Sequence, residues 1–322
     1  MNKRVLVVGG AGFIGSFLCR ELLKKGCFVV AYDNLMRGKK ENIVNLNGNN
    51  FIFIEADAND LSTLKNTIVA NKIEYIFHLA ANSDIQASAS NPDIEFESTS
   101  KTTWSVLSAM KETGVKNLFF ASTSAVYGEL VNNKPFKEDD TLNPISYYGA
   151  AKMASEAYIK SFSYMNGFNS LIFRFPNVIG PNLTHGVFYD FINRLNLDPS
   201  KLVVLGDGTQ CKPYLHVKDL VNAILLLCWN NKGVNIFNVG VETATSVKTI
   251  AEMVISEMHI SNCQIIYGKE NVGWKGDVPK FSYCLDKIYS TGWSATLTSD
   301  QASLETIKEA LKKWLLQDLR LE

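Results

Sequence analysis

The chain has 322 residues, of which 46% are hydrophobic and 20% are charged, as is ordinary for a soluble globular enzyme with a large core. Lysine plus arginine equals aspartate plus glutamate, 32 of each, so no net field favours nucleic acid or an anionic membrane surface. No apolar run approaches the about 18 residues of a membrane span, and the start MNKRVLVVGG has no secretory signal. We therefore expect a cytoplasmic protein that binds neither nucleic acid nor membrane.

Short apolar strands alternate with amphipathic helical stretches through the first half of the chain. The strand candidates occupy residues 4–9, 27–33, 51–57, 75–80, 117–122 and 170–175. Helical periodicity marks the stretches between them, such as GSFLCRELLKKG and TTWSVLSAMKETG. Continuous apolar strands that alternate with helices indicate a parallel sheet covered on both faces. We predict an α/β fold, a doubly wound, Rossmann-like domain over residues 1–175.

After residue 176 the pattern changes to shorter elements separated by loops. The loops include GDGTQ and GKENVGWKGDVPK, and the elements between them include KLVVLG and TSVKTIAEMVISEM. We predict a smaller, mixed substrate-binding region over residues 176–322, interleaved with the main sheet through a returning strand and helix.

A glycine-rich loop follows the first predicted strand, in VLVVGGAGFIGS. Gly9, Gly12 and Gly15 fit a GxxGxxG spacing, and GxGxxG fits when the first glycine is Gly10. Such glycines permit a tight turn, close approach of a pyrophosphate and close helix packing. The following helix N-terminus, with Phe13 and Ile14, offers free N–H groups to a phosphate. The loop therefore predicts a dinucleotide site.

Acidic residues at the ends of the next two strands bear on the choice of dinucleotide. Asp33 can accept hydrogen bonds from the adenosine ribose hydroxyls and would repel a 2′-phosphate, which favours NAD over NADP. We assign the adjacent Asn34 to the same site. Asp57 and Ala58 follow the next strand, where an adenine amino group could be bound. A plain helix N-cap is an equal alternative for Asp57.

A series of motifs gives the chain a resemblance to a known family. The motifs are GGAGFIGS, YDN, HLAA, STSAVYG, YxxxK over residues 148–152, and FRFPNVIGPN. With these in order, the chain resembles the extended short-chain dehydrogenase/reductase family, in its UDP-glucose 4-epimerase-like group of nucleotide-sugar epimerases and dehydratases. The resemblance implies NAD as cofactor, a nucleoside-diphosphate sugar as ligand, and a homodimer joined through TTWSVLSAMKET and YYGAAKMASEAYIKSF.

The resemblance also implies a catalytic set of Thr123, Tyr148 and Lys152. Oxidising a sugar carbinol requires hydride transfer from carbon and a base for the hydroxyl proton. Free tyrosine, with a pKa of about 10, is a poor base at neutral pH. A lysine four residues further along a helix lies on the same face, where its charge favours the phenolate. Without the other motifs, YxxxK would equally fit a buried helix face.

The resemblance places further residues around the two ligands. The backbone of Leu79, Ala80 and Ala81 is expected to approach the cofactor. The residues implied at the sugar nucleotide are Ser88, Thr123, Ser124, Asn177, His185, Phe188, Lys212 and Trp274. Lys212 and Trp274 stand where the family usually has arginine, so the base of the nucleotide stays undetermined. We predict no metal ligands, and expect His78 in the core and His216 in support of its loop.

The two positions after Thr123 bear on the reaction. Family members that are 4,6-dehydratases typically have an Asp-Glu pair there, whereas this chain has Ser124 and Ala125, which cannot carry a proton as a carboxyl would. We therefore expect a 4-epimerase that acts by transient C4 oxidation and re-reduction. The alternative within the class is a net 4-dehydrogenase or reductase, with a 4,6-dehydratase disfavoured. The alternative outside it is a non-catalytic NAD-binding scaffold.

Overall fold

The computed structural model describes residues 2–82, 88–130, 134–183, 185–270, 278 and 280–318. The chain forms two compact units. The first contains Met1–Gly128, Glu138–Phe175 and Val221–Asn238, and the second contains Glu129–Lys137, Pro176–Leu220 and Val239–Glu322. The predicted boundary after residue 175 is one of the points at which the chain passes from the first unit to the second.

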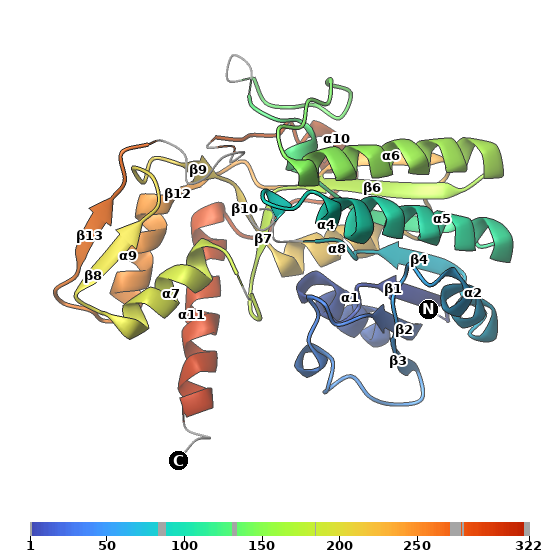
Figure 1. Ribbon diagram of the computed structural model, residues 1–322, viewed down its shortest axis with the longest axis horizontal. Coiled ribbons are helices and arrows are strands. Elements are labelled where there is room, and N and C mark those ends of the chain that lie inside the picture. The colour runs from blue at the N-terminus through green and yellow to red at the C-terminus, as the bar shows by residue number, and fades with distance from the viewer. Residues whose placement is uncertain are drawn as a thin grey trace. The chain divides into compact units, whose positions relative to one another are not determined.

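The first unit is built on a parallel sheet of seven strands, in the order β11-β6-β5-β4-β1-β2-β3 (Figure 1). Its strands are β1 (Arg4–Val8), β2 (Phe28–Asp33), β3 (Phe51–Glu55), β4 (Tyr75–His78), β5 (Asn117–Thr123), β6 (Asn169–Phe175) and β11 (Val234–Asn238). All neighbouring strands pair in parallel. The order reverses between β1 and β4, which makes the carboxyl ends of these strands the place where such sheets bind ligands. The predicted fold class is confirmed.

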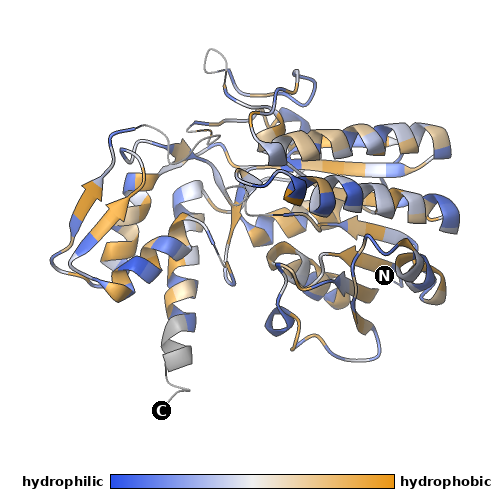
Figure 2. Cartoon of the chain, viewed as in Figure 1, coloured by the Kyte–Doolittle hydropathy of each residue, from blue (hydrophilic) through white to orange (hydrophobic). Residues whose placement is uncertain are grey.

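Helices cover both faces of this sheet. On one face, α2 (Leu61–Ala70), α5 (Thr102–Thr113) and α6 (Tyr147–Asn166) share a core with the strands. That core includes Leu6, Val8, Ile76, Leu118, Phe120 and Ile172. Neighbouring strand residues such as Val7 are also buried and point to the opposite face, against which α1 (Phe13–Lys24) packs. Figure 2 shows the result, with apolar strands between helices whose outer faces carry hydrophilic residues.

Short helical segments complete the first unit. The 3₁₀ turns are η1 (Lys40–Asn42) and η3 (Ser124–Val126), and α4 (Asp93–Glu95) leads into a π-helix, η2 (Phe96–Lys101), which continues into α5. The helix α8 (Val217–Leu227) carries the chain from the second unit into the first. Beyond it, Trp229 packs edge-on against Phe77, with ring centroids 6.2 Å apart. A π-helix is rare and often marks a functional site.

The second unit contains three two-stranded sheets and the helices packed on them. Its elements are β7 (Asn177–Ile179), α7 (Val187–Leu197), β8 (Lys201–Val204), β9 (Cys211–Lys212), β10 (Tyr214–His216), β12 (Thr245–Ser246), α9 (Val247–Glu257), β13 (Gln264–Tyr267), α10 (Asp286–Tyr289) and α11 (Ser299–Asp318). The pairs are β7 with β10, β8 with β13, and β9 with β12. A separate core includes Phe188, Leu202, Tyr214, Ile250 and Ala302.

Within the described ranges, no helix is both long and apolar enough to cross a membrane. The six cysteines are free thiols, as their irregular spacing suggests.

Candidate functional site

The loop between β1 and α1 is shaped by its glycines. Gly9 has a φ of 85°, in the left-handed region, and a β-carbon added to it would lie 2.7 Å from the backbone nitrogen of Ala80. A β-carbon on Gly15 would overlap the carbonyl oxygen of Gly9, so the helix rests directly on the loop. For Gly12, in contrast, the described residues offer only the Gly9 oxygen, at 3.2 Å. Internal packing thus requires glycine at two of these positions and leaves room at Gly12.

The N-terminus of α1 lies beside that room. Gly12 is the N-cap residue, no side chain caps the helix, and its first turn contains no acidic residue. The first N–H groups of a helix have no intrahelical acceptor and carry a partial positive charge. This end of the helix, with Phe13 and Ile14 in its first turn, therefore fits the pyrophosphate of a dinucleotide.

Asp33 is held at the carboxyl end of β2. Its carboxylate accepts hydrogen bonds from the backbone N–H of Ala11 at 3.0 Å and of Leu35 at 2.8 Å. Burial raises the pKa of Asp33, and these two hydrogen bonds oppose the shift. Each carboxylate oxygen can accept a second hydrogen bond. Asp33 therefore keeps capacity for the ribose hydroxyls that the sequence assigns to it.

Asn34 and Asp57 are joined across neighbouring strand ends. The Asn34 side-chain amide donates to an Asp57 carboxylate oxygen at 3.1 Å, and the other oxygen accepts from the Asn59 backbone at 2.7 Å. The N-cap of α2 is Asp60, which accepts from the Thr63 backbone N–H at 3.1 Å. The alternative of a helix N-cap for Asp57 is therefore wrong, because the N-cap lies three residues later. Next to this pair, Ala58 is buried.

The carboxyl end of β4 lies against the glycine loop. The backbone N–H groups of Leu79 and Ala80 both donate to the carbonyl of Val8, at 2.9 and 3.0 Å. This pairing keeps the HLAA backbone beside Gly9, at the switch point of the sheet. Leu79, Ala80 and Ala81 are partly exposed there, so their backbone fits the predicted approach to a cofactor.

Tyr148 lies in the first turn of α6. Ser146 caps this helix by accepting a hydrogen bond from the Gly149 backbone N–H at 3.1 Å. A β-carbon on Gly149 would overlap the carbonyl oxygen of Ala125, so the helix start packs directly on η3. Thr123 precedes η3, and its side chain makes a hydrogen bond with that of Tyr148. The structure thus brings together two of the three predicted catalytic residues from separate elements.

Lys152, the third predicted catalytic residue, lies one turn further along α6 and is 2% exposed. Its Nζ donates to the carbonyl of Ala121 at 2.7 Å and lies 5.8 Å from the ring centroid of Tyr148. Burial lowers the pKa of Lys152 to about 8, while the carboxylates of Glu95 and Glu156 act in the opposite direction. The ammonium is therefore stabilised by two acidic neighbours.

The same surroundings act on Tyr148, whose side chain is half-buried. Burial raises the pKa of Tyr148 well above its ordinary value, the nearby Glu95 raises it further, and the hydrogen bond with Thr123 lowers it. The lowering that the sequence predicts from Lys152 is not found: of these influences only the hydrogen bond with Thr123 favours the phenolate, and desolvation penalises it. An additional positive charge at the site would lower the pKa of Tyr148 and so favour its action as a base.

A buried ion pair fixes α6 against the sheet. Arg174 of β6 and Glu156 of α6 are both 1% exposed and form two hydrogen bonds, of 2.9 and 2.6 Å. Ser122 of β5 donates to the same carboxylate at 2.6 Å. Because Glu156 lies one turn after Lys152, this pair holds the turn that carries the lysine next to the end of β5.

Glu95 is a site residue that the sequence analysis missed. It is 2% exposed, and its two carboxylate oxygens accept hydrogen bonds from the Asn82 amide at 2.7 Å and the Thr99 hydroxyl at 3.0 Å. It ends α4, which packs against α6, the helix that carries Tyr148 and Lys152, and its charge raises the pKa of both groups. The polar stretch NPDIEFE has no feature that predicts a buried carboxylate.

His78 lies in the core, as expected. Its Nε2 is 3.1 Å from the Thr103 hydroxyl oxygen, and burial lowers the pKa of His78 to about 3. The imidazole is therefore neutral at physiological pH and is not a source of charge for the site.

Of the residues predicted at the sugar nucleotide, Ser88 and Ser124 belong to the first unit. Ser88 is buried, and Ser124 begins η3 directly after Thr123. In the second unit, Asn177 is the exposed first residue of β7, and Lys212 lies in β9 opposite Thr245.

The other three residues predicted at the sugar nucleotide are His185, Phe188 and Trp274. His185 is exposed just before α7. Phe188, in contrast, is 2% exposed and packs edge-on against Tyr214, with centroids 5.2 Å apart. It is a core residue of the second unit, because the apolar face of α7 points inward. Trp274 lies outside the described residues.

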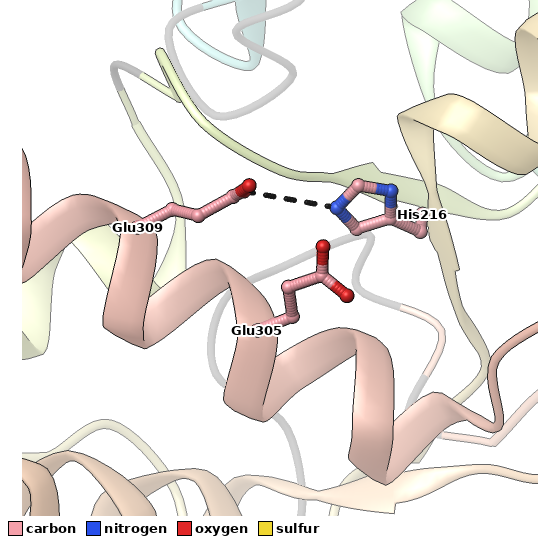
Figure 3. Close-up of side chains that lie close together, drawn as sticks. All are labelled: His216, Glu305 and Glu309. Carbon is pink, nitrogen blue, oxygen red and sulfur yellow. Dashed lines mark ion pairs between the residues drawn. The ribbon is translucent and has the colours of Figure 1, made fainter.

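His216 lies close to two glutamates of α11 (Figure 3). Its Nε2 is 3.8 Å from a carboxylate oxygen of Glu309, and Glu305 lies one turn earlier on the helix. The Nζ of Lys218 is 2.5 Å from Glu305 and 3.5 Å from Glu309. The ammonium of Lys218 thus offsets part of the negative charge of the two carboxylates, and we interpret the group as an ion-pair network at the β10–α8 junction.

Comparison with known proteins identifies the family. Residues 5–240 match the model of the NAD dependent epimerase/dehydratase family. The chain belongs to this family. It is accordingly an NAD-dependent enzyme, and the glycine loop, the uncapped start of α1 and Asp33 fit that cofactor.

Individual relatives support the same assignment and differ in reaction. A UDP-glucose 4-epimerase of Thermotoga maritima, solved with UDP-glucose, is 30% identical with a TM-score of 0.87, over 97% of this chain and 99% of that one. The Thermus thermophilus UDP-glucose 4-epimerase in complex with NAD is 28% identical with a TM-score of 0.84, over 95% and 98%. A UDP-N-acetyl-alpha-D-glucosaminuronate decarboxylase of Bacillus cytotoxicus is 31% identical over 81% of this chain and 82% of its own length.

Proposed function

We propose that this protein is an NAD-dependent nucleotide-sugar 4-epimerase. The observation that carries the proposal is the hydrogen bond between Tyr148 and Thr123, with the ammonium of Lys152 one helical turn away. The relatives that act on UDP-sugars, together with NAD as cofactor, support a sugar carbinol as the group on which this set acts.

The protein residues handle the proton of the reaction. Tyr148 accepts the proton of the C4 hydroxyl as the C4 hydrogen leaves as hydride, and it returns that proton when the ketone is reduced from the other face. Thr123 hydrogen-bonds the reacting oxygen, and Lys152 holds the nicotinamide ribose and adds positive charge. Bound NAD supplies the hydride acceptor and, in its oxidised form, a further positive charge that favours the phenolate of Tyr148.

The groups beside Thr123 favour epimerisation over loss of water. Ser124 and Ala125 begin η3, so neither of the two positions directly after Thr123 carries a carboxyl. Elimination across C5 and C6 needs an acid and a base placed at that carbon pair. Oxidation at C4 followed by re-reduction needs only the set already described.

We propose a nucleoside-diphosphate sugar as substrate. Ser88, Ser124, Asn177, His185 and Lys212 are candidates for its recognition. Asn177 and Lys212 offer an amide and an ammonium, which suit sugar hydroxyls and a diphosphate. Trp274 completes the predicted set by sequence position alone.

We also propose a homodimer formed through α5 and α6. Trp104 of α5 is 50% exposed, and its ring packs edge-on against Tyr158 and Phe162 of α6, at 5.4 and 5.2 Å between centroids. A half-exposed tryptophan that joins two neighbouring helices is the kind of aromatic anchor that protein interfaces bury.

The reaction is tested with purified protein and a panel of UDP-, GDP-, CDP- and dTDP-sugars. Bound NAD is measured by absorbance, sugar configuration at C4 by NMR, and reduced cofactor by its own absorbance band. The proposal predicts inversion at C4 of at least one sugar without accumulation of NADH. Stoichiometric NADH with a released 4-keto product would identify a net dehydrogenase instead, and no turnover with any sugar would favour a scaffold.

A further inference from the structure

Glu95 is a carboxylate buried where α4 packs against α6, the helix that carries Tyr148 and Lys152. It is 2% exposed, and the two side chains that hydrogen-bond to its oxygens, Asn82 and Thr99, are neutral and are 2% and 0% exposed. Burying a carboxylate is costly unless hydrogen bonds and opposite charge compensate it. The site therefore contains a buried negative group that the proposed proton transfer does not itself use.

The elements around Glu95 direct it toward α6. It ends α4 and precedes the π-helix η2, and both segments pack against α6, which carries Tyr148 and Lys152. On the other side, Arg37 donates to the side-chain Oδ1 of Asn82 at 3.1 Å, and the Asn82 side-chain Nδ2 in turn donates to Glu95. Among the described residues, the titratable and charged groups linked to Glu95 are thus Tyr148 and Lys152 of the neighbouring α6, on which its charge acts, and Arg37 through the Asn82 amide.

The acidic residue two positions further on is placed quite differently. Glu97 lies within the π-helix η2, which Glu95 precedes. Its side chain is 53% exposed and forms a surface ion pair of 2.6 Å with Lys101. Glu97 therefore provides a matched control for charge and sequence neighbourhood.

We propose that Glu95 is a positioning residue that sets the pH range in which Tyr148 and Lys152 work together. The proposal rests on the proposed function, in which Tyr148 exchanges a proton with the substrate. A negative charge in this place disfavours the phenolate of Tyr148 and favours the ammonium of Lys152. Both groups consequently titrate at higher pH than they would without Glu95, and the lysine keeps its proton where the tyrosine must lose one.

The first test measures the ionisation of Tyr148 without any sugar. Tyrosinate absorbance of the NAD-bound protein is titrated with pH, and subtraction of the same titration for a Tyr148→Phe variant isolates this one phenol. In the Glu95→Gln background, Tyr148 is expected to ionise about one pH unit lower, as follows from removing a close like charge. Glu97→Gln is expected to leave the titration unchanged. An unshifted Tyr148 in Glu95→Gln would overturn the proposal.

The second test is the pH profile of turnover. Both limbs of the profile are expected to move to lower pH in Glu95→Gln, whereas a merely structural role would lower the rate without moving the limbs. Glu95→Asp, which keeps the charge, should restore the original pH positions. If Glu95→Gln does not fold, Glu95→Met removes the charge with a side chain of similar length and gives the same two readouts.

The two tests separate the two proposals. A shifted tyrosinate titration without turnover of any sugar would retain the role of Glu95 and reject the 4-epimerase. If a sugar is turned over, but Glu95→Gln shifts neither the tyrosinate titration nor the limbs of the pH profile, the 4-epimerase is retained and the role of Glu95 is rejected.

Discussion

The glycine loop offers a comparison between two alanine substitutions three residues apart. In Gly15→Ala the new methyl group overlaps the Gly9 carbonyl oxygen, which is backbone and cannot swing aside. Alanine gains about 1 kcal/mol of helix propensity over glycine. Overpacking against backbone costs about 1–3 kcal/mol. We expect the upper end of that cost, and hence a net loss of about 2 kcal/mol from the unfolding free energy of the NAD-free protein.

Gly12→Ala is expected to act on the cofactor instead. The nearest described atom to its new methyl group is the Gly9 oxygen at 3.2 Å, and the φ and ψ of Gly12, −70° and 176°, suit alanine. The NAD-free protein should therefore lose less than about 1 kcal/mol, mostly from the poorer N-cap. The methyl group would project where we place the pyrophosphate, so the Kd for NAD should rise at least about tenfold, or about 1.4 kcal/mol.

Urea unfolding of the NAD-free proteins and calorimetric titration with NAD measure the two quantities separately. The expected pattern is a stability loss that is larger in Gly15→Ala, and an affinity loss in Gly12→Ala that its stability does not explain. Unaltered NAD affinity in Gly12→Ala would refute the placement of the pyrophosphate. Full stability in Gly15→Ala would refute the packing argument.

Three further predictions concern Lys152, Arg174 and Trp104. Lys152 has a pKa of about 8 when folded and about 10.4 when unfolded, so the unfolded chain binds more protons between these values. Its contribution to the unfolding free energy therefore rises with pH in that window, and Lys152→Met should abolish the rise in urea unfolding measured at several pH values. Arg174→Leu leaves Glu156 buried without its partner and should cost about 3–5 kcal/mol by the same assay, with part recovered when Glu156→Leu is added. Trp104→Glu should yield a monomer in size-exclusion chromatography with light scattering, and a persisting dimer would place the interface elsewhere.

Much of the first unit is predictable from the sequence because its strands are continuous apolar runs. The predicted strands at residues 4–9 and 117–122 differ from β1 and β5 by one residue at the carboxyl end. The agreement is close because a parallel strand that is buried on both faces appears in the sequence as a continuous apolar run. Strand order is harder to predict. That β11 adds to the sheet beside β6 follows from packing over a separation of about sixty residues, which local periodicity does not encode.

The parts of the site where a sequence motif fixes the backbone geometry were predictable. The parts where tertiary packing decides which side chains are buried were less so. Gly9 and Gly15 are required by contacts that their spacing anticipates. The burial of Glu95 and the core position of Phe188 were not predicted. Glu95 lies in a polar stretch but is buried, and it accepts hydrogen bonds from Asn82, which follows β4, and from the nearby Thr99. Phe188 follows a predicted binding loop but packs in the core of the second unit. Neither outcome is visible without the tertiary structure.

The central claim is that Tyr148 exchanges the proton of the sugar hydroxyl. The most direct measurement compares C4 inversion by Tyr148→Phe and Tyr147→Phe proteins that retain bound NAD, because Tyr147 is the adjacent tyrosine and is 52% exposed. The account predicts that Tyr148→Phe loses about a thousandfold in rate, in the range that general acid–base catalysis supplies. It predicts that Tyr147→Phe keeps the rate of the unaltered protein. Full turnover by Tyr148→Phe would contradict the account.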